Sequence, residues 1–274
     1  MADRSLIEWT DATWNVVTGC SRVSRGCENC YAERLAATRL KHHPSRRRLV
    51  DANGRWTGEV RLNEQWLDQP LRWRKPRNIF VAAHGDLFHE NVPDEWLDSI
   101  FAIIDLCPRH VFQILTKRPE RMRAYMSAFR SPPPNAWLGV SVEDQPAADL
   151  RIDRLLHTLA AIRWISVEPM LGRVDLLHLK PPHCRPTTVD ALRGMRHYAG
   201  AAMPAPAALD WVVAGGESGP RARTIRPEWA RDLQRQCFLA GVPFFFKQWG
   251  GITSKAGGCE LDGRQWRQMP GDLG

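Results

Sequence analysis

Six short apolar runs, rich in β-branched and aromatic residues, recur along the chain and alternate with stretches of helical pattern. Continuous apolar runs of this length are typical of strands buried on both faces, as in parallel sheets. The runs are 79–82, 111–115, 137–141, 164–167, 211–214 and 242–246. The helical stretches are 93–107, 119–129, 147–159 and 227–240, and several begin with Pro at or near the first turn. The pattern therefore predicts repeated βαβ units.

The repetition of these units predicts the fold class. Right-handed βαβ repeats close into a full or partial barrel, or form an open doubly wound sheet. Of these, we expect an α/β fold with a partial, TIM-like (β/α)6 barrel, in a single domain over 1–274. The segment 180–209 interrupts the alternation, because it holds five prolines, many alanines and no clear periodicity. It is predicted to be an inserted loop.

Polar residues gather directly after the predicted strands. The segments are 84–86 (HGD), 116–118 (TKR), 141–144 (SVED), 168–169 (EP), 215–218 (GGES) and 247–249 (KQW). Any one of them could simply mark the start of a loop. In barrels, however, catalytic groups cluster at the carboxyl ends of the strands, so six such segments together favour a site there.

The composition is that of an ordinary globular protein. The 274 residues are 43% hydrophobic and 25% charged, which excludes a disordered or collagenous chain. No apolar run reaches 18 residues, and the first ten residues carry Asp3, Arg4 and Glu8 where a signal peptide needs an apolar core. We therefore expect a cytoplasmic protein.

The charge balance is basic. Lys and Arg number 38 against 30 Asp and Glu, a formal net charge of +8 that favours polyanionic partners such as nucleic acid. Only six of the 38 are Lys, so the excess of Arg could also reflect codon usage. The cluster 41–48 (KHHPSRRR) is either a solvated face or a stripe that contacts phosphates.

Three cysteines lie close together near the N-terminus. Cys20, Cys27 and Cys30 have the spacing C-x6-C-x2-C, and the total of seven cysteines argues against a disulfide framework. Three thiolates without a fourth ligand are a poor fit to a closed tetrahedral zinc site. They fit a four-iron cluster with one open iron. The other cysteines, 107, 184, 237 and 259, are scattered and are interpreted as core or incidental thiols.

The cysteine motif belongs to a longer recognisable stretch. The segments 7–15 (IEWTDATWN), 18–20 (TGC) and 26–33 (GCENCYAE) resemble the phage-type three-cysteine-motif family of bacteria and phages. That family is similar to a divergent branch of the radical S-adenosylmethionine superfamily. The resemblance extends to 86–90, 115–119, 138–143, 215–219 and 242–250, so it spans nearly the whole chain.

The resemblance implies a [4Fe-4S] cluster held by Cys20, Cys27 and Cys30. The amino and carboxylate groups of S-adenosylmethionine would chelate the open iron, and an external electron donor would drive cleavage of the sulfonium to a 5′-deoxyadenosyl radical. The sequence departs from the common superfamily spacing C-x3-C-x2-C, because three extra residues separate Cys20 from Cys27.

Six further residues are candidates around that cofactor. The resemblance places Tyr31 near the adenine and Gly215, Gly216 and Glu217 at the amino group, with substrate binding or barrel structure as rival roles for Glu217. Lys117 follows a buried strand, where a cation could meet the cofactor carboxylate or form a structural ion pair. The strand-end carboxylate of Glu168 is a candidate for the ribose hydroxyls or the substrate. The side chains of His84, Asp86 and His89 could line the cavity.

Two functions from different classes follow. The first is a radical S-adenosylmethionine enzyme acting on nucleic acid in repair or modification, supported by similarity to spore photoproduct lyase around Tyr31-Ala32 and Thr116-Lys117. A second phage- or defence-encoded protein could act with it. The alternative is a non-catalytic, nucleic-acid-binding phage-related protein whose cysteines hold structural zinc or a structural iron-sulfur cluster.

Overall fold

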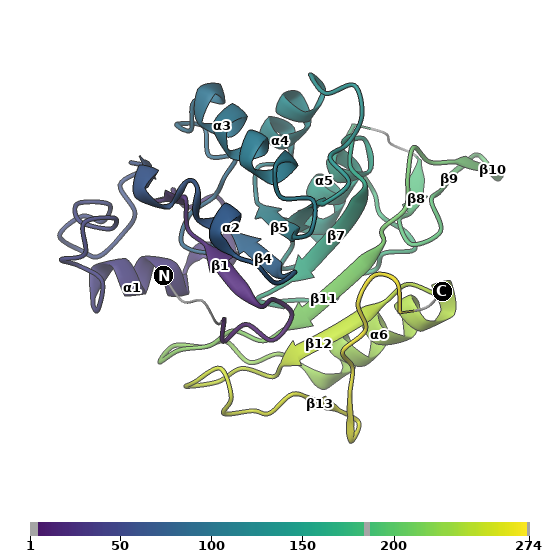
Figure 1. Ribbon diagram of the computed structural model, residues 1–274. Helices are drawn as coiled ribbons and strands as arrows, with labels where there is room; N and C mark the ends of the chain where they lie inside the picture. The colour runs from purple at the N-terminus through teal and green to yellow at the C-terminus, as the bar shows by residue number, and fades with distance from the viewer. Residues whose placement is uncertain (1–4, 184–186, 273–274) are drawn as a thin grey trace. The chain divides into compact units, whose positions relative to one another are not determined.

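The computed structural model describes residues 5–183 and 187–272 (Figure 1). The chain divides into two compact units. Unit 1 comprises Met1–Leu138 and Leu159–Ala161, and unit 2 comprises Gly139–Thr158 and Ile162–Gly274. The strand β6 (Ala136–Ser141) contains the boundary between Leu138 and Gly139.

Unit 1 is built on parallel strands in the order β1 (Ala12–Trp14), β4 (Asn78–Val81) and β5 (Val111–Thr116). Successive residues of a strand point to opposite faces. Ile79 and Phe80 are nonetheless both buried. The apolar runs 79–82 and 111–115 therefore correspond to strands covered on both faces, as the sequence predicts.

The helices α3 (Asp94–Asp105) and α4 (Pro119–Met126) follow β4 and β5. α3 starts with two acidic residues, which suit the positive end of a helix dipole. Its buried residues Leu97, Phe101 and Ile104 form one apolar stripe. Phe101 packs against Tyr125 of α4 with ring centroids 5.3 Å apart. This packing keeps the two helices together.

Short elements around the cysteines complete unit 1. They are β2 (Val17–Thr18), η1 (Arg25–Cys27), α1 (Tyr31–Ala37), β3 (Arg61–Leu62), η2 (Glu64–Trp66) and α2 (Gln69–Arg72). None extends beyond seven residues, so none leaves a strong periodic pattern in the sequence.

Unit 2 contains the parallel strands β7 (Ile162–Val167), β11 (Trp211–Gly215) and β12 (Phe244–Gln248), in that order. Its helices are α5 (Gln145–Leu156) and α6 (Pro227–Ala240). α6 begins with Pro at its first turn and is capped at its C-terminus by Gly241, whose φ of 68° is the left-handed conformation that glycine adopts without penalty.

The segment 180–209 is an insertion between β7 and β11, but it is not an irregular loop as expected. It forms an antiparallel sheet of β8 (Thr188–Asp190), β9 (Met195–Tyr198) and β10 (Ala201–Pro204). The β9–β10 turn consists of Ala199 and Gly200, both with positive φ, as a tight hairpin requires. Residues 184–186 lie outside the described residues. A second hairpin joins β13 (Glu260–Leu261) and β14 (Arg264–Gln265).

The predicted fold class is confirmed at the level of architecture. In each unit, parallel strands alternate with helices, so the chain is a mixed α/β protein. The single domain over 1–274 stays a prediction. Across 5–183 and 187–272, every helix is too short or too polar to cross a bilayer.

Candidate functional site

The cysteine loop of unit 1 begins at a tight turn after β2. Gly19 has a φ of 98°, and a Cβ built on it would lie 2.1 Å from the carbonyl oxygen of Glu59. Only glycine can occupy this position, because both the backbone angle and the available space exclude a side chain. Cys20 follows at once, Cys27 ends η1, and Cys30 precedes α1. All three thiols are half-buried.

Arg118 connects this loop to the segments that follow β4 and β5. Its Nη1 donates to Asp86 Oδ2 at 2.9 Å and lies 3.7 Å from the Sγ of Cys20. Its Nε donates to Glu90 at 2.6 Å, and its Nη2 donates to the Ser21 hydroxyl at 2.6 Å. Arg118 is only 9% exposed, so one largely buried guanidinium positions the first cysteine.

Asp86 is the counter-ion of that guanidinium, and both of its carboxylate oxygens accept further hydrogen bonds. Its Oδ1 accepts hydrogen bonds from the Thr116 hydroxyl at 2.7 Å and from the Phe88 amide at 3.0 Å. Its Oδ2 also accepts from the Lys117 amide at 3.2 Å. The polar residues that follow β4 and β5 therefore converge on one carboxylate.

Burial dominates the acidity of two of the thiols. It raises the pKa of Cys20 to about 12, with a further rise from the negative charge of Asp86, while Arg118 acts in the opposite direction. Burial also raises the pKa of Cys30, although the backbone amides of Glu33 and Ala32 stabilise its thiolate. Both groups are therefore thiols at neutral pH, and a bound metal would have to displace their protons.

The three cysteines share one electrostatic neighbourhood. Cys30 raises the pKa of Cys20, and Cys27 raises that of Cys30. The donor set suits a thiolate-held cluster, because soft sulfur ligands select iron-sulfur centres and zinc. Within 5–183 and 187–272, no three His, Cys, Asp or Glu side chains are already gathered to hold an ion. Cys27, for example, is turned toward the Ser24 hydroxyl at 4.0 Å.

Two predicted residues, Lys117 and Tyr31, lie beside the cysteines. Lys117 follows β5, and its charge opposes the rise in the pKa of Cys30. Tyr31 starts α1, is 41% exposed and donates its hydroxyl hydrogen bond to the Ala83 carbonyl. Its ring meets the edge of His84 at a centroid distance of 6.0 Å. The structure thus brings Tyr31, Lys117 and the cysteines into unit 1.

Glu168 belongs to unit 2, where it forms an ion pair. Its Oε1 lies 3.1 Å from Nζ of Lys247, and the Ser166 hydroxyl donates to its Oε2 at 3.3 Å. A Cβ on Gly215 would lie 2.5 Å from Oε1 of Glu168. Glycine at this strand end therefore leaves the space that the carboxylate occupies.

Glu217 is held by Arg223. The guanidinium donates from Nη2 to Oε1 at 2.7 Å and from Nε to Oε2 at 3.0 Å, and the Arg223 amide adds a third bond at 2.9 Å. Gly216 has a structural role, because a Cβ there would lie 1.9 Å from the Trp249 carbonyl oxygen. Contact with a cofactor amino group stays a prediction for 215–217.

The sequence prediction passed over Arg118. The sequence marks 116–118 as a polar strand end and indicates only Lys117 within it as a candidate. One feature of the sequence could have indicated Arg118. It directly precedes Pro119, the first residue of α4, and therefore lies at the junction between the strand end and the helix. The missing information was the distant contact with Cys20, which is 98 residues away in sequence.

These observations define a class of protein: an α/β protein with parallel strands, in which a half-buried group of cysteines is tied to residues following two strands. The model of the family described as "Protein of unknown function (DUF5131)" matches residues 4–270, and the chain belongs to that family. Comparison with curated proteins and with solved structures found no significant match.

Proposed function

We propose that the chain is a cytoplasmic radical S-adenosylmethionine enzyme of the partial (β/α)6 barrel type. Cys20, Cys27 and Cys30 hold a [4Fe-4S] cluster in this proposal, and the cofactor binds at its open iron. The cytoplasm suits six free thiols among the described cysteines, because that compartment is reducing.

One observation carries the proposal: a nearly buried arginine contacts the first cysteine of a three-cysteine loop. Arg118 opposes the burial that keeps Cys20 protonated, so it favours the thiolate that a metal requires. Lys117 favours the thiolate of Cys30 in the same way. Two consecutive cations beside the thiols lower the cost of assembling an anionic cluster.

The residues of unit 1 have distinct parts in this proposal. Arg118 positions the cysteine loop through Ser21 and Cys20. Lys117 would supply a cation for the carboxylate of the cofactor, and the partly exposed ring of Tyr31 would offer an apolar surface for its adenine. The bound cluster would supply the electron that cleaves the cofactor to a 5′-deoxyadenosyl radical.

Metal analysis of anaerobically purified protein tests the proposal. We expect about four irons and matching sulfide per chain, and an EPR signal of the reduced protein that changes when S-adenosylmethionine is added. Cys27→Ala should lose the iron and keep its circular dichroism spectrum, whereas Cys259→Ala, outside the cysteine loop, should keep both. Zinc in place of iron, or a cluster indifferent to the cofactor, would overturn the radical mechanism and support a structural metal site.

A further inference from the structure

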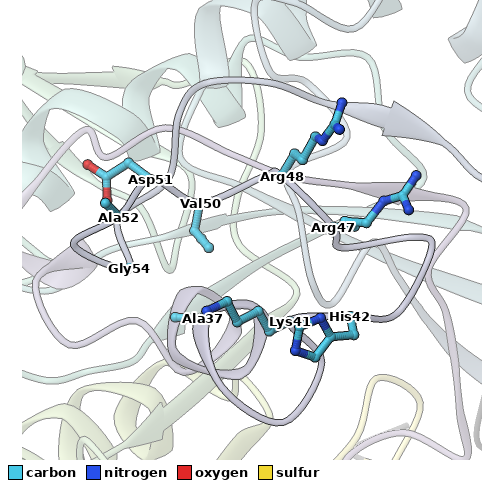
Figure 2. Close-up of a pocket in the computed structure, with 9 residues that line it drawn as sticks. All are labelled: Ala37, Lys41, His42, Arg47, Arg48, Val50, Asp51, Ala52 and Gly54. Carbon is cyan, nitrogen blue, oxygen red and sulfur yellow. The ribbon is translucent and has the colours of Figure 1, made fainter.

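A basic pocket lies beyond the end of α1 in unit 1. It is a cavity of about 360 Å³ between residues at and just after the end of that helix and the loop that follows. Figure 2 shows Ala37, Lys41 and His42 on one side of it. The other side is formed by Arg47, Arg48, Val50, Asp51, Ala52 and Gly54. This size is sufficient for a small anionic group.

Several basic side chains line this pocket and lie at the surface. Lys41, His42, Arg47 and Arg48 are all exposed. Among the ion pairs and hydrogen bonds of residues 5–183 and 187–272, none involves the side chain of Lys41, Arg47 or Arg48. Arg61 bonds to the backbone carbonyl of Arg47, which leaves the guanidinium of Arg47 outside that contact.

The acid at the pocket does not neutralise these cations. The Oδ1 atom of Asp51 accepts hydrogen bonds from the backbone amides of Asn53 and Arg55 at 2.8 and 2.9 Å. In Figure 2 its carboxylate lies on the opposite side of the pocket from the two guanidinium groups. Arg46 is directed elsewhere, with its Nη2 atom 2.6 Å from Nδ1 of His84. The pocket therefore presents net positive charge to solvent.

Arg48, which lines the pocket, has a strained backbone. Its φ of 69° is left-handed, which is unfavourable for a residue with a Cβ. Figure 2 shows the guanidinium groups of the consecutive residues Arg47 and Arg48 on the same side of the loop. Strain of this kind is found preferentially at functional sites.

We propose that Lys41, Arg47 and Arg48 bind the phosphate groups of a nucleic-acid strand at this pocket. Exposed, adjacent Lys and Arg side chains contact consecutive phosphates of a polyanion and fix its path across the surface. A buried cradle for one free phosphate would require converging, desolvated donors, whereas these cations are all exposed.

The pocket also has a defined place relative to the cysteines. α1 starts directly after Cys30 and ends at Ala37, which lines the pocket. Seven residues of helix span about 10 Å. A strand held at the pocket would thus have neighbouring nucleotides within reach of the cysteine loop. The placement of nucleotides near the cysteine loop rests on the proposed function and names nucleic acid as the substrate class of that enzyme. The binding of phosphates at the pocket does not depend on the proposed function.

Fluorescence anisotropy with a labelled single-stranded oligonucleotide of about 20 nucleotides tests the proposal over a range of salt concentrations. The test variant is Lys41→Gln, Arg47→Gln and Arg48→Gln in the full-length chain. Each lost phosphate contact lowers the slope of log K against log salt by about 0.7, so the slope should fall by about 2. The matched control changes one lysine and two arginines that are also exposed: Arg109→Gln, Arg123→Gln and Lys255→Gln.

Loss of binding confined to the pocket variant supports the proposal. Equal loss in the control variant, or no binding by the wild-type protein, overturns it. Two further ligands, inorganic phosphate and phosphatidylserine vesicles, test whether the pocket recognises phosphate from a source other than nucleic acid. Displacement of the oligonucleotide by inorganic phosphate, but not by sulfate at the same ionic strength, would indicate a site for a free anion. Binding to phosphatidylserine vesicles in place of the oligonucleotide would indicate a membrane surface. Either result also overturns it.

The two proposals fail separately. Iron content and EPR test the cysteine site, and oligonucleotide binding tests the pocket. The Cys27→Ala variant should lose its iron and retain its affinity for the oligonucleotide.

Discussion

Nη1 of Arg118 lies 2.9 Å from Oδ2 of Asp86, and both side chains are less than a tenth exposed. The pair ties the segments after β4 and β5 to each other, and through Cys20 it ties both to the cysteine loop. A second carboxylate, Glu90, meets the same guanidinium but is 59% exposed. The buried carboxylate of Asp86 and the exposed carboxylate of Glu90 thus share the guanidinium of Arg118.

This difference predicts unequal effects on stability. Asp86→Asn leaves Arg118 without its buried partner, and breaking a buried pair costs about 3 kcal/mol. Glu90→Gln removes the solvent-screened partner and should cost less than about 1 kcal/mol. Urea unfolding followed by fluorescence would measure both, and equal losses would contradict a special role for the buried pair.

The pH dependence of stability should contain a contribution from His84. Burial and the charges of Arg46 and Arg39 lower its pKa from 6.5 to about 4. Between these values the unfolded chain binds a proton that the folded chain does not, so stability is full above pH 6.5 and falls as the pH drops toward 4. The loss attributable to this group is at most about 3 kcal/mol.

His84→Gln removes that contribution. Thermal unfolding between pH 7 and pH 4 should then show a shallower decline than in the wild-type protein. An unchanged decline would mean that other groups determine the acid sensitivity.

Gly216, which directly follows β11, should tolerate no side chain, whatever binds there. Gly216→Ala places a Cβ 1.9 Å from the Trp249 carbonyl oxygen, and relieving this clash requires backbone movement. We expect a loss of about 3 kcal/mol. Gly172→Ala is the control, because its Cβ would meet Asp144 at 3.3 Å and needs only a small adjustment. Comparable melting temperatures for the two variants would refute this account of Gly216.

The pair Glu217–Arg223 permits a test of the role of Glu217. If the carboxylate serves mainly as the partner of Arg223, then Glu217→Gln and Arg223→Gln should both destabilise the protein by about 2 kcal/mol. If it holds the amino group of the cofactor, Glu217→Gln should chiefly weaken S-adenosylmethionine binding. Unfolding curves and calorimetric titration of the cofactor, measured on both variants, separate these outcomes.

Arg48→Gly should separate stability from binding. Glycine relieves the left-handed backbone strain, so the free energy of unfolding should rise by up to about 1 kcal/mol. Loss of the guanidinium should weaken oligonucleotide binding at the same time. A variant that loses stability, or that binds as well as the wild-type protein, would count against the strain at this position being part of a binding site.

The strands were predictable because burial on both faces leaves a continuous apolar run, such as 111–115, that needs no knowledge of the neighbours. The cysteine motif was predictable for a related reason, since its three thiols are separated by ten residues at most. Short elements escaped prediction. β1 has three residues, and the strands of 188–204 depend on turn geometry and pairing rather than on a hydrophobic period.

The α/β alternation, the local cysteine motif and the basic character of 41–48 can therefore be recognised from the sequence alone. Which charges act together depends on the packing of distant segments. Arg118 meets Cys20, Lys247 meets Glu168, and Arg46 turns to His84 while Arg47 and Arg48 are left to solvent. Periodicity reports how each residue is exposed along its own element, whereas the partner of a charge depends on which distant segments the packed core brings within a few ångströms.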